Sequence, residues 1–276
     1  MIFSHFKRRR GVRFDDGFRH SARSGVAPDP LVATYDAILA TDPTVPVLLQ
    51  LTEYRGQQVL WQDPACTIPV EDIGDPIGGV RHPETGEILA VQETDSNRPA
   101  WGGREVGASL DEGQWLEVPL SAFDIGQTDI FSIFMTVDKF SADHRSSFFT
   151  STEGDPAEGI ALTQPRSSTN RTHQFTVGDG ESFLNTGTVS NPSGLRWFED
   201  IDLTGVVSDT LEGTHTLYFN GETTAYGTDR IPPSNTLKLG FDAFSGPGFY
   251  EGNSKFLVVY EQDATADVPT LLEAAQ

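Results

Sequence analysis

Thr214-His-Thr-Leu-Tyr-Phe-Asn-Gly-Glu-Thr-Thr-Ala-Tyr226 is the stretch of this sequence that decides the fold. Leu217 and Phe219 alternate with polar residues at a period of two, which is typical of a half-buried strand. Asn220-Gly221 follows, and both of these residue types tolerate the positive φ angles that a tight turn between strands requires. The stretch therefore predicts a β-hairpin.

Two more strands and a helix are predicted downstream of this hairpin. Thr236-Leu-Lys-Leu-Gly-Phe-Asp242 places Leu237 and Leu239 on one face of a strand. Ser254-Lys-Phe-Leu-Val-Val-Tyr260 is apolar on both faces, which is typical of a strand buried between two layers. The segment from Asp267 to Gln276 then predicts a short helix with Asp267 as its N-cap.

Upstream of the hairpin, short alternating segments recur and are separated by turn residues. They are 105–110, 114–118, 130–140, 146–152, 159–164, 173–177 and 195–203. The segment 130–140 predicts a central core strand that contains Phe131, Ile133, Phe134 and Met135. Many short strands with no long helix predict an all-β fold, an antiparallel two-sheet jelly-roll sandwich with short flanking helices.

The N-terminal part of the chain differs from this pattern. Leu31, Tyr35, Ile38 and Leu39 fit one face of a helix between Asp29 and Thr41. Residues 47–51 and 57–61 predict a hairpin, and residues 63–99 are rich in Pro, Gly and Asp. We therefore expect an arm and attachment region at 1–59 and a sandwich domain at 60–276, with an irregular lead-in at 60–99.

The order of these segments resembles that of a known superfamily. The hairpin, the Leu-Gly strand, the last strand and the terminal helix resemble the laminin-G-like members of the concanavalin A-like lectin/glucanase superfamily. The lead-in resembles that of many phage and prophage proteins with such a domain, in Leu60-Trp-Gln-Asp63, Thr67-Ile-Pro-Val70, Gly74-Asp-Pro-Ile-Gly-Gly-Val-Arg81, Gly86 and Asn97-Arg-Pro99. The resemblance runs from about Leu60 to the C-terminus and implies a concanavalin A-like sandwich on a particle surface.

Charge excludes some classes of partner and favours others. The net charge of −21 and the pI near 4.4 disfavour nucleic acid and anionic membranes as partners of the main body. We expect no membrane span, because no apolar run approaches the length that a bilayer requires. We also expect no signal peptide, because Lys7-Arg-Arg-Arg10 interrupts the apolar start of the chain. Release inside a particle on cell lysis, a virion location, fits these expectations.

The first 23 residues form a basic arm on this acidic body. They hold seven of the nineteen basic residues, among them Lys7, Arg8, Arg9, Arg10 and Arg13, against two acids. One interpretation is an anchor that docks on an acidic capsid or tail subunit, because arginine pairs bidentately with carboxylates. A solvated tail is the alternative interpretation, and contact with nucleic acid is a third.

One acidic motif matches a catalytic spacing. Glu153-Gly-Asp-Pro-Ala-Glu158 has the E-x-D-x-x-E spacing of laminarinase-like glycoside hydrolases, which use paired carboxylates on one strand. Gly154 and Pro156 favour a turn here instead, because proline cannot donate to a strand ladder. The sequence therefore predicts no catalytic residue.

Metal binding is open. We expect no cofactor other than a candidate calcium ion, which acidic loops of related domains bind through oxygen ligands. The candidate ligands are Asp179, Glu181, Glu199, Asp200 and Asp202, and chance clustering in so acidic a body is the alternative. The six histidines are scattered, and the single cysteine, Cys66, is expected to be a small, partly buried residue.

Trp197, with Glu199 and Asp200, is the candidate carbohydrate-binding group. An exposed indole stacks on the apolar face of a pyranose while nearby carboxylates accept hydrogen bonds from its hydroxyls. The alternative is that each of the four tryptophans packs in the core.

Together these features give the functional hypothesis of a non-enzymatic structural protein of a phage or phage-like particle, such as a capsid decoration, head spike or tail component. Its lectin-like domain would bind host surface polysaccharide, or only reinforce a shell. We expect a homo-oligomer, with a trimer favoured over a dimer. A free carbohydrate-binding protein or a laminarinase-like hydrolase is the alternative.

Overall fold

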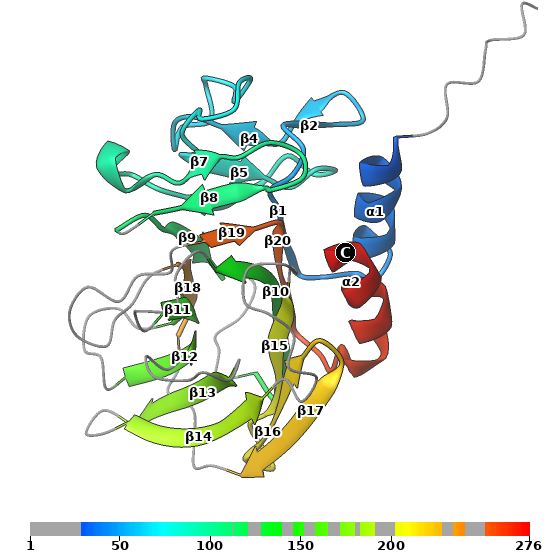
Figure 1. The fold of residues 1–276 in the computed structure, drawn as a ribbon, viewed down its shortest axis with the longest axis vertical. Coiled ribbons are helices and arrows are strands. Elements are labelled where there is room, and N and C mark those ends of the chain that lie inside the picture. The colour runs from blue at the N-terminus through cyan, green and yellow to red at the C-terminus, as the bar shows by residue number, and fades with distance from the viewer. Residues whose placement is uncertain are drawn as a thin grey trace, which may run out of the picture.

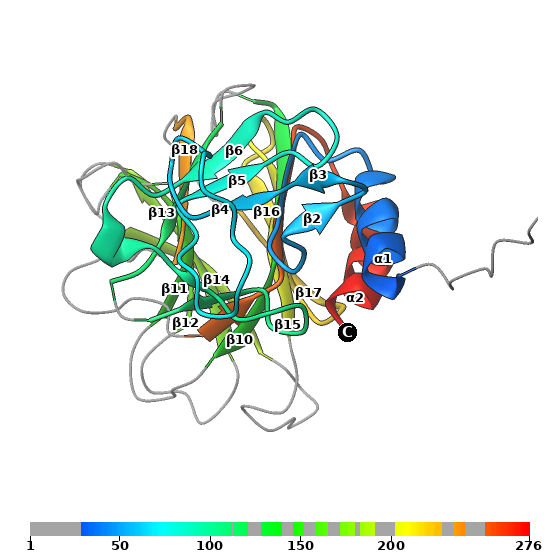
Figure 2. The same ribbon diagram turned by 90° about the horizontal axis from the view of Figure 1, so that it is seen from above.

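The computed structural model describes residues 29–111, 113–120, 128–139, 146–151, 158–164, 172–179, 183–190, 202–227, 234–240 and 252–276. Two antiparallel sheets face each other in a sandwich, and two helices lie next to each other along one side of it (Figures 1 and 2). Each sheet buries one apolar face against the other, which is how an all-β chain builds a core. The all-β, two-sheet sandwich predicted from the sequence is confirmed.

The first sheet is centred on β10, which pairs with β15 on one side and with β20 and then β19 on the other. Its nine strands are β1 (Val45–Leu48), β7 (Ala100–Trp101), β8 (Ala108–Leu110), β10 (Ile130–Lys139), β15 (Asp202–Asp209), β16 (Thr214–Phe219), β17 (Glu222–Gly227), β19 (Gly252–Ser254) and β20 (Phe256–Tyr260).

The second sheet also has nine strands, in the order β14-β13-β12-β11-β18-β9-β6-β5-β4. They are β4 (Leu60–Trp61), β5 (Gly79–Arg81), β6 (Ile88–Val91), β9 (Leu116–Pro119), β11 (Ser146–Thr150), β12 (Glu158–Gln164), β13 (Thr172–Asp179), β14 (Phe183–Ser190) and β18 (Thr236–Leu239). The remaining elements are a small hairpin of β2 (Glu53–Tyr54) and β3 (Gln57–Gln58), and the 3-10 turns η1 (Asp95–Asn97) and η2 (Thr265–Asp267).

The predicted core strand is confirmed in β10. Phe131, Ile133, Phe134 and Met135 are all fully buried, and so is every residue of β20. Both faces of these strands are covered because the second sheet packs on one face and helices and loops cover the other.

The hairpin predicted for residues 214–226 is confirmed in β16 and β17. Phe219 pairs with Glu222 across the turn, and the two turn residues have positive φ, 48° at Asn220 and 85° at Gly221. Leu217 and Phe219 are fully buried. The Asn-Gly pair therefore sets the register of this edge of the first sheet.

Both short helices are present. In α1 (Pro30–Leu39), the Asp29 side chain accepts a hydrogen bond from the Leu31 amide at 3.1 Å, and Tyr35 and Ile38 are buried as predicted. In α2 (Val268–Ala275), Asp267 takes the N-cap position, but its side chain makes no capping hydrogen bond. Asp267 has helical φ and ψ angles, because it also closes the preceding 3-10 turn.

The predicted hairpin of residues 47–51 and 57–61 is confirmed only around its turn, where Glu53–Tyr54 pair with Gln57–Gln58. The rest of its predicted strands pair elsewhere. Residues 45–48 form β1, which pairs with β20, over two hundred residues downstream, in the register Val47 to Leu257. Residues 60–61 form β4 and pair with β5 in the other sheet. The division of the chain at residue 59 stays a prediction, but strand pairing crosses it.

The strand β14 was not predicted. Its sequence contains Asn185 and Gly187, which have low strand propensity, and the pairing with β13 shifts register at this point. The predicted strand 195–203 also differs, because the described part of that segment is the start of β15, which continues to Asp209.

Candidate functional site

Most of the site residues proposed from the sequence lie outside the described residues. Trp197, Glu199 and Asp200 fall in 191–201, and the arm residues Lys7, Arg8, Arg9, Arg10 and Arg13 fall in 1–28. Their proposed roles in sugar binding and anchoring stay predictions. The described residues that adjoin these two segments are Asp202, the first residue of β15, and Asp29, the N-cap of α1.

A side-chain clamp fixes the start of β15. The Asn220 amide nitrogen donates to Asp202 Oδ1 at 2.7 Å, and Asn220 Oδ1 accepts from the Leu203 amide at 2.8 Å. The Asn220 backbone amide donates in turn to the Leu203 carbonyl at 2.9 Å. Asp202 is buried. The hairpin tip therefore holds the point where the chain enters the sheet after the segment that carries Trp197.

The calcium hypothesis stays a prediction. Among the described ranges, no group of three or more His, Cys, Asp or Glu side chains could hold a metal ion. Glu181, Glu199 and Asp200 lie outside those ranges, and Asp179 is the last residue of β13. Asp202 is buried and accepts the Asn220 amide.

Of the three acids in the E-x-D-x-x-E motif, the described residues include only Glu158. Glu158 is the first residue of β12, where its backbone pairs with that of Asp179, and Glu153 and Asp155 lie outside the described residues. The turn that the sequence predicts between these acids also lies outside the described residues.

A serine and a histidine meet inside the sandwich. Ser208 Oγ and His215 Nδ1 are 2.5 Å apart, and the His215 ring lies 5.6 Å from the Phe175 ring of the second sheet. Burial lowers the pKa of His215 to about 4, so the imidazole is neutral at pH 7. Ser208 is 0% and His215 1% exposed, so this pair joins the two layers and is out of reach of a substrate.

Helix α1 is fixed to the sandwich at both ends. Near its C-terminal end, Asp36 accepts hydrogen bonds from Tyr54 Oη at 2.5 Å and from Arg55 Nη2 at 2.7 Å, and these bonds lower the pKa of Asp36. Burial raises the pKa of Tyr54 to about 12. At the N-terminal end, Arg104 forms an ion pair with Asp29. The hairpin β2–β3 and the β7–β8 loop therefore set the position of this helix.

Helix α2 is fixed by a buried lysine. Strand β10 pairs first with β20 and then with β19, and the register shifts by one residue between the two pairings. At this shift, Thr136 Oγ1 accepts hydrogen bonds from the backbone amides of Lys255 and Phe256. Lys255 therefore sits in a bulge, and its ammonium nitrogen donates to the Ala275 carbonyl at 2.8 Å. Lys255 is 6% exposed, and burial lowers the pKa of its ammonium group.

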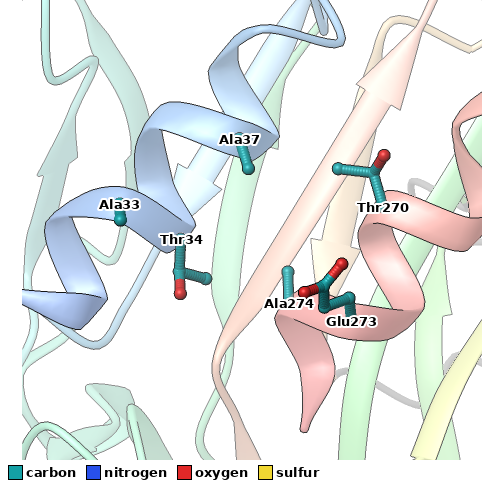
Figure 3. A pocket seen from close by; sticks show the side chains of 6 residues that line it. All are labelled: Ala33, Thr34, Ala37, Thr270, Glu273 and Ala274. Atoms are coloured by element: carbon teal, nitrogen blue, oxygen red, sulfur yellow. The ribbon is translucent and has the colours of Figure 1, made fainter.

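An open groove lies between the two helices. It has a volume of about 210 Å³ and is lined by Ala33, Thr34, Ala37, Thr270, Glu273 and Ala274. Figure 3 shows the α1 side chains on one wall and the α2 side chains on the other. Ala33, Ala37 and Glu273 are exposed. Small side chains keep the two helix surfaces open here, and Glu273 is the one charged residue among those that line it.

Sequence reasoning missed the clamp, the buried lysine and the groove. The sequence identified Asn220 only as a turn residue, because its two side-chain hydrogen bonds reach residues that lie seventeen and eighteen positions earlier in the chain. No sequence signal marked Ala33 and Ala37 as groove residues, because small residues are common on the exposed face of a helix. The groove exists only because α1 and α2, at opposite ends of the chain, are held next to each other.

Comparison with known proteins supports the fold. No protein-family model matches the sequence, and no curated protein sequence matches it. The receptor binding domain of botulinum neurotoxin D aligns with a TM-score of 0.50 at 10% identity, covering 84% of this chain and 52% of that one. This chain thus spans about half the length of that domain.

Two structures with lower TM-scores are also similar. The CBM40 of the Ruminococcus gnavus IT-sialidase, bound to α2,3 sialyllactose, aligns with a TM-score of 0.42 at 15% identity, covering 61% of this chain and 95% of that one. The native heptameric SAP-like pentraxin of Limulus polyphemus aligns with a TM-score of 0.41 at 13% identity, covering 52% and 69%. At these identities the likeness concerns the fold alone, which is a sandwich of two antiparallel sheets.

None of the helices in the described parts of the chain is long and apolar enough to cross a membrane.

Proposed function

We propose that this chain is a non-catalytic, lectin-like binding module of a phage or phage-like particle, and that it binds host surface polysaccharide. The observation that carries the proposal is the clamp between Asn220 and Asp202. It fixes Asp202, where the chain enters β15 directly after the segment that contains Trp197, Glu199 and Asp200, and every residue of β15 except Asp209 is buried. Binding residues on loops need such a scaffold, because affinity depends on holding them in place.

The chemistry of the candidate residues suits a sugar. The Trp197 indole would stack on the apolar face of a pyranose, and the Glu199 and Asp200 carboxylates would accept hydrogen bonds from its hydroxyls. The sialyllactose-bound and receptor-binding neighbours are too distant to transfer a ligand to this chain. The expected ligand is therefore a polysaccharide, with no particular sugar assigned.

The basic arm supplies the particle side of the proposal. Lys7, Arg8, Arg9, Arg10 and Arg13 would dock on acidic surfaces of capsid or tail subunits, which the strongly acidic body would otherwise repel. The chain would then be a virion component in symmetric copies, with a trimer favoured. The charge contrast between arm and body supports this anchor.

A glycan array of host surface polysaccharides tests the binding function. The full chain should bind, Trp197→Ala should lose at least about 2 kcal/mol of binding, roughly thirtyfold in Kd, and Trp197→Phe should keep most of the signal because it retains an aromatic face. Leu211→Ala, at a residue 74% exposed on another loop, is the surface control. Equal binding by all four proteins would contradict the assigned site.

Mass spectrometry of particles released from cells that encode the chain tests the location. The full chain should be found in them, and charge reversal at Arg8, Arg9 and Arg10 should remove it while the protein stays folded. Absence of the wild-type chain from every particle would reject the virion role. Glycan binding in that case would favour the free carbohydrate-binding alternative, and glycan cleavage lost in Glu158→Gln would favour the hydrolase.

A further inference from the structure

The groove between α1 and α2 carries an unbalanced negative charge. Helix α1 contains Asp36 and helix α2 contains Glu273, and neither Pro30–Leu39 nor Val268–Ala275 contains a basic residue. Asp36 is neutralised by Arg55 at 2.7 Å, whereas Glu273 forms no ion pair within the described residues. At the carbonyl end of α2, Lys255 donates to the Ala275 carbonyl, and its ammonium group offsets the partial negative charge of this helix end. The groove is therefore lined by small side chains and contains one carboxylate, that of Glu273.

The basic arm begins beside this groove. Residues 1–28 end directly before Asp29 and Pro30, which open the helix that forms one wall. The ion pair with Arg104 holds Asp29, the residue that directly follows the arm, in a fixed position. The nearest aromatic residue followed by a base is Phe18-Arg19, about twelve residues ahead of the helix. Twelve residues span up to about 40 Å, against about 15 Å for the length of α1, so this pair can return to the groove.

We propose that the groove is the docking seat of the chain's own basic arm, with Phe18 between the small side chains of Ala33, Ala37 and Ala274 and Arg19 paired with Glu273. Charge complementarity selects this occupant, because Glu273 is the one charged residue that lines the groove and seven of the first 23 residues are basic. Tethering favours the chain's own arm over a second copy, because a short tether raises the local concentration of the arm to about the millimolar range.

This inference goes beyond the proposed particle anchor and does not depend on it. Docking on the groove uses Phe18 and Arg19, whereas the proposed anchor uses Lys7, Arg8, Arg9, Arg10 and Arg13, so the two contacts involve different parts of the arm.

Limited trypsin digestion of the full chain, followed by mass spectrometry, tests the seat. Trypsin cleaves after Arg19 and Arg23, and it acts on the fraction of molecules in which the arm is undocked. Two variants disturb the groove. Ala37→Trp fills it, and Glu273→Lys reverses its one charge. Both should raise the rate of cleavage at these arginines by about tenfold, and 0.5 M salt should do the same to the wild type.

Matched controls place the same changes elsewhere on the surface. Ala225→Trp and Glu222→Lys alter exposed residues of β17 and should leave the cleavage rate unchanged. Equal rates in all five proteins would overturn the proposal. If Ala37→Trp fails to fold by circular dichroism, Glu273→Lys decides alone.

Protein concentration separates the two sources of the arm. Protection that is the same at 1 μM and 100 μM supports docking within one chain. Protection that appears only at the higher concentration would overturn this assignment, because the groove would then hold the arm of another copy. Neither result involves particles or glycans, so failure here is distinct from failure of the proposed function.

Discussion

Asn220 at the tip of the β16–β17 hairpin donates its side-chain amide to the buried carboxylate of Asp202 at 2.7 Å. The same side chain accepts the Leu203 amide, and Asn220 itself has a φ of 48°. One residue thus closes the turn and fixes the entry of β15. Both tasks need asparagine, because it tolerates positive φ and carries both a donor and an acceptor.

Two substitutions of Asn220 should separate these tasks in chemical denaturation. Asn220→Gly keeps the turn and loses the clamp, so the free energy of unfolding should fall by about 1–2 kcal/mol. Asn220→Ala loses the clamp and also strains the backbone, which should cost about 1–2 kcal/mol more. Thr223→Ala, at an exposed residue of β17, should change little. Equal stability of the Gly variant and wild type would show that the clamp has no energetic role.

Gly205→Ala should destabilise the centre of the first sheet. Gly205 pairs with Phe134, and a Cβ atom at this position would lie 2.4 Å from both the Ile133 carbonyl oxygen and the Phe134 ring. The first of these atoms belongs to the backbone and has no rotamer to change. We expect a loss of about 1–3 kcal/mol in thermal or chemical unfolding, as for other overpacked cores. An unchanged midpoint would mean that β10 and β15 lie farther apart than the structure gives.

Stability should fall on acidification through His215. Its pKa is about 4 in the folded protein and 6.5 in an unfolded chain, so between these values the unfolded state binds a proton that the folded state does not. The free energy of unfolding should therefore drop by about 3 kcal/mol from pH 7 to pH 4 on account of this group. His215→Gln should remove that part of the pH dependence. A parallel pH profile in the variant would contradict the assignment.

Lys255→Met should loosen the C-terminal helix. Methionine keeps much of the apolar stem but loses the hydrogen bond to the Ala275 carbonyl, so backbone amides at the end of α2 should exchange with deuterium faster. The change should be about one order of magnitude, as expected for loss of one charge-assisted bond. Lys238→Met, whose ammonium group lies over the Trp115 ring at 5.2 Å, is the control and should leave α2 unchanged. Equal exchange in both variants would contradict the role of Lys255.

Local pattern was sufficient where the partner of a residue is close in sequence. The β16–β17 hairpin, the apolar strands β10 and β20, and the helix α1 all follow from periodicity and turn chemistry within a few residues. It failed for residues 45–48, because a short apolar run does not say which strand it will pair with. It failed for β14 because Asn185 and Gly187 form a strand only when β13 supplies the hydrogen bonds.

The candidate site divides in the same way. Trp197 with its neighbouring acids, and the basic arm, were found from residue type and charge, and their roles stay predictions. Residue type and charge could not reveal three other features. They are the clamp by Asn220, the buried ammonium group of Lys255 and the groove at Ala33 and Ala37. Each depends on contacts between residues that are distant in the chain.

The sequence by itself determined the class of this protein: an acidic β-sandwich with short flanking helices and a basic arm. It could do so because strand periodicity, turn residues and net charge are local or summed properties. Only the tertiary structure decided that β1 closes against β20, that His215 is buried and neutral, and that α1 and α2 form a groove beside the start of the arm. These features arise when burial of apolar surface brings both ends of the chain to the same side of the sandwich.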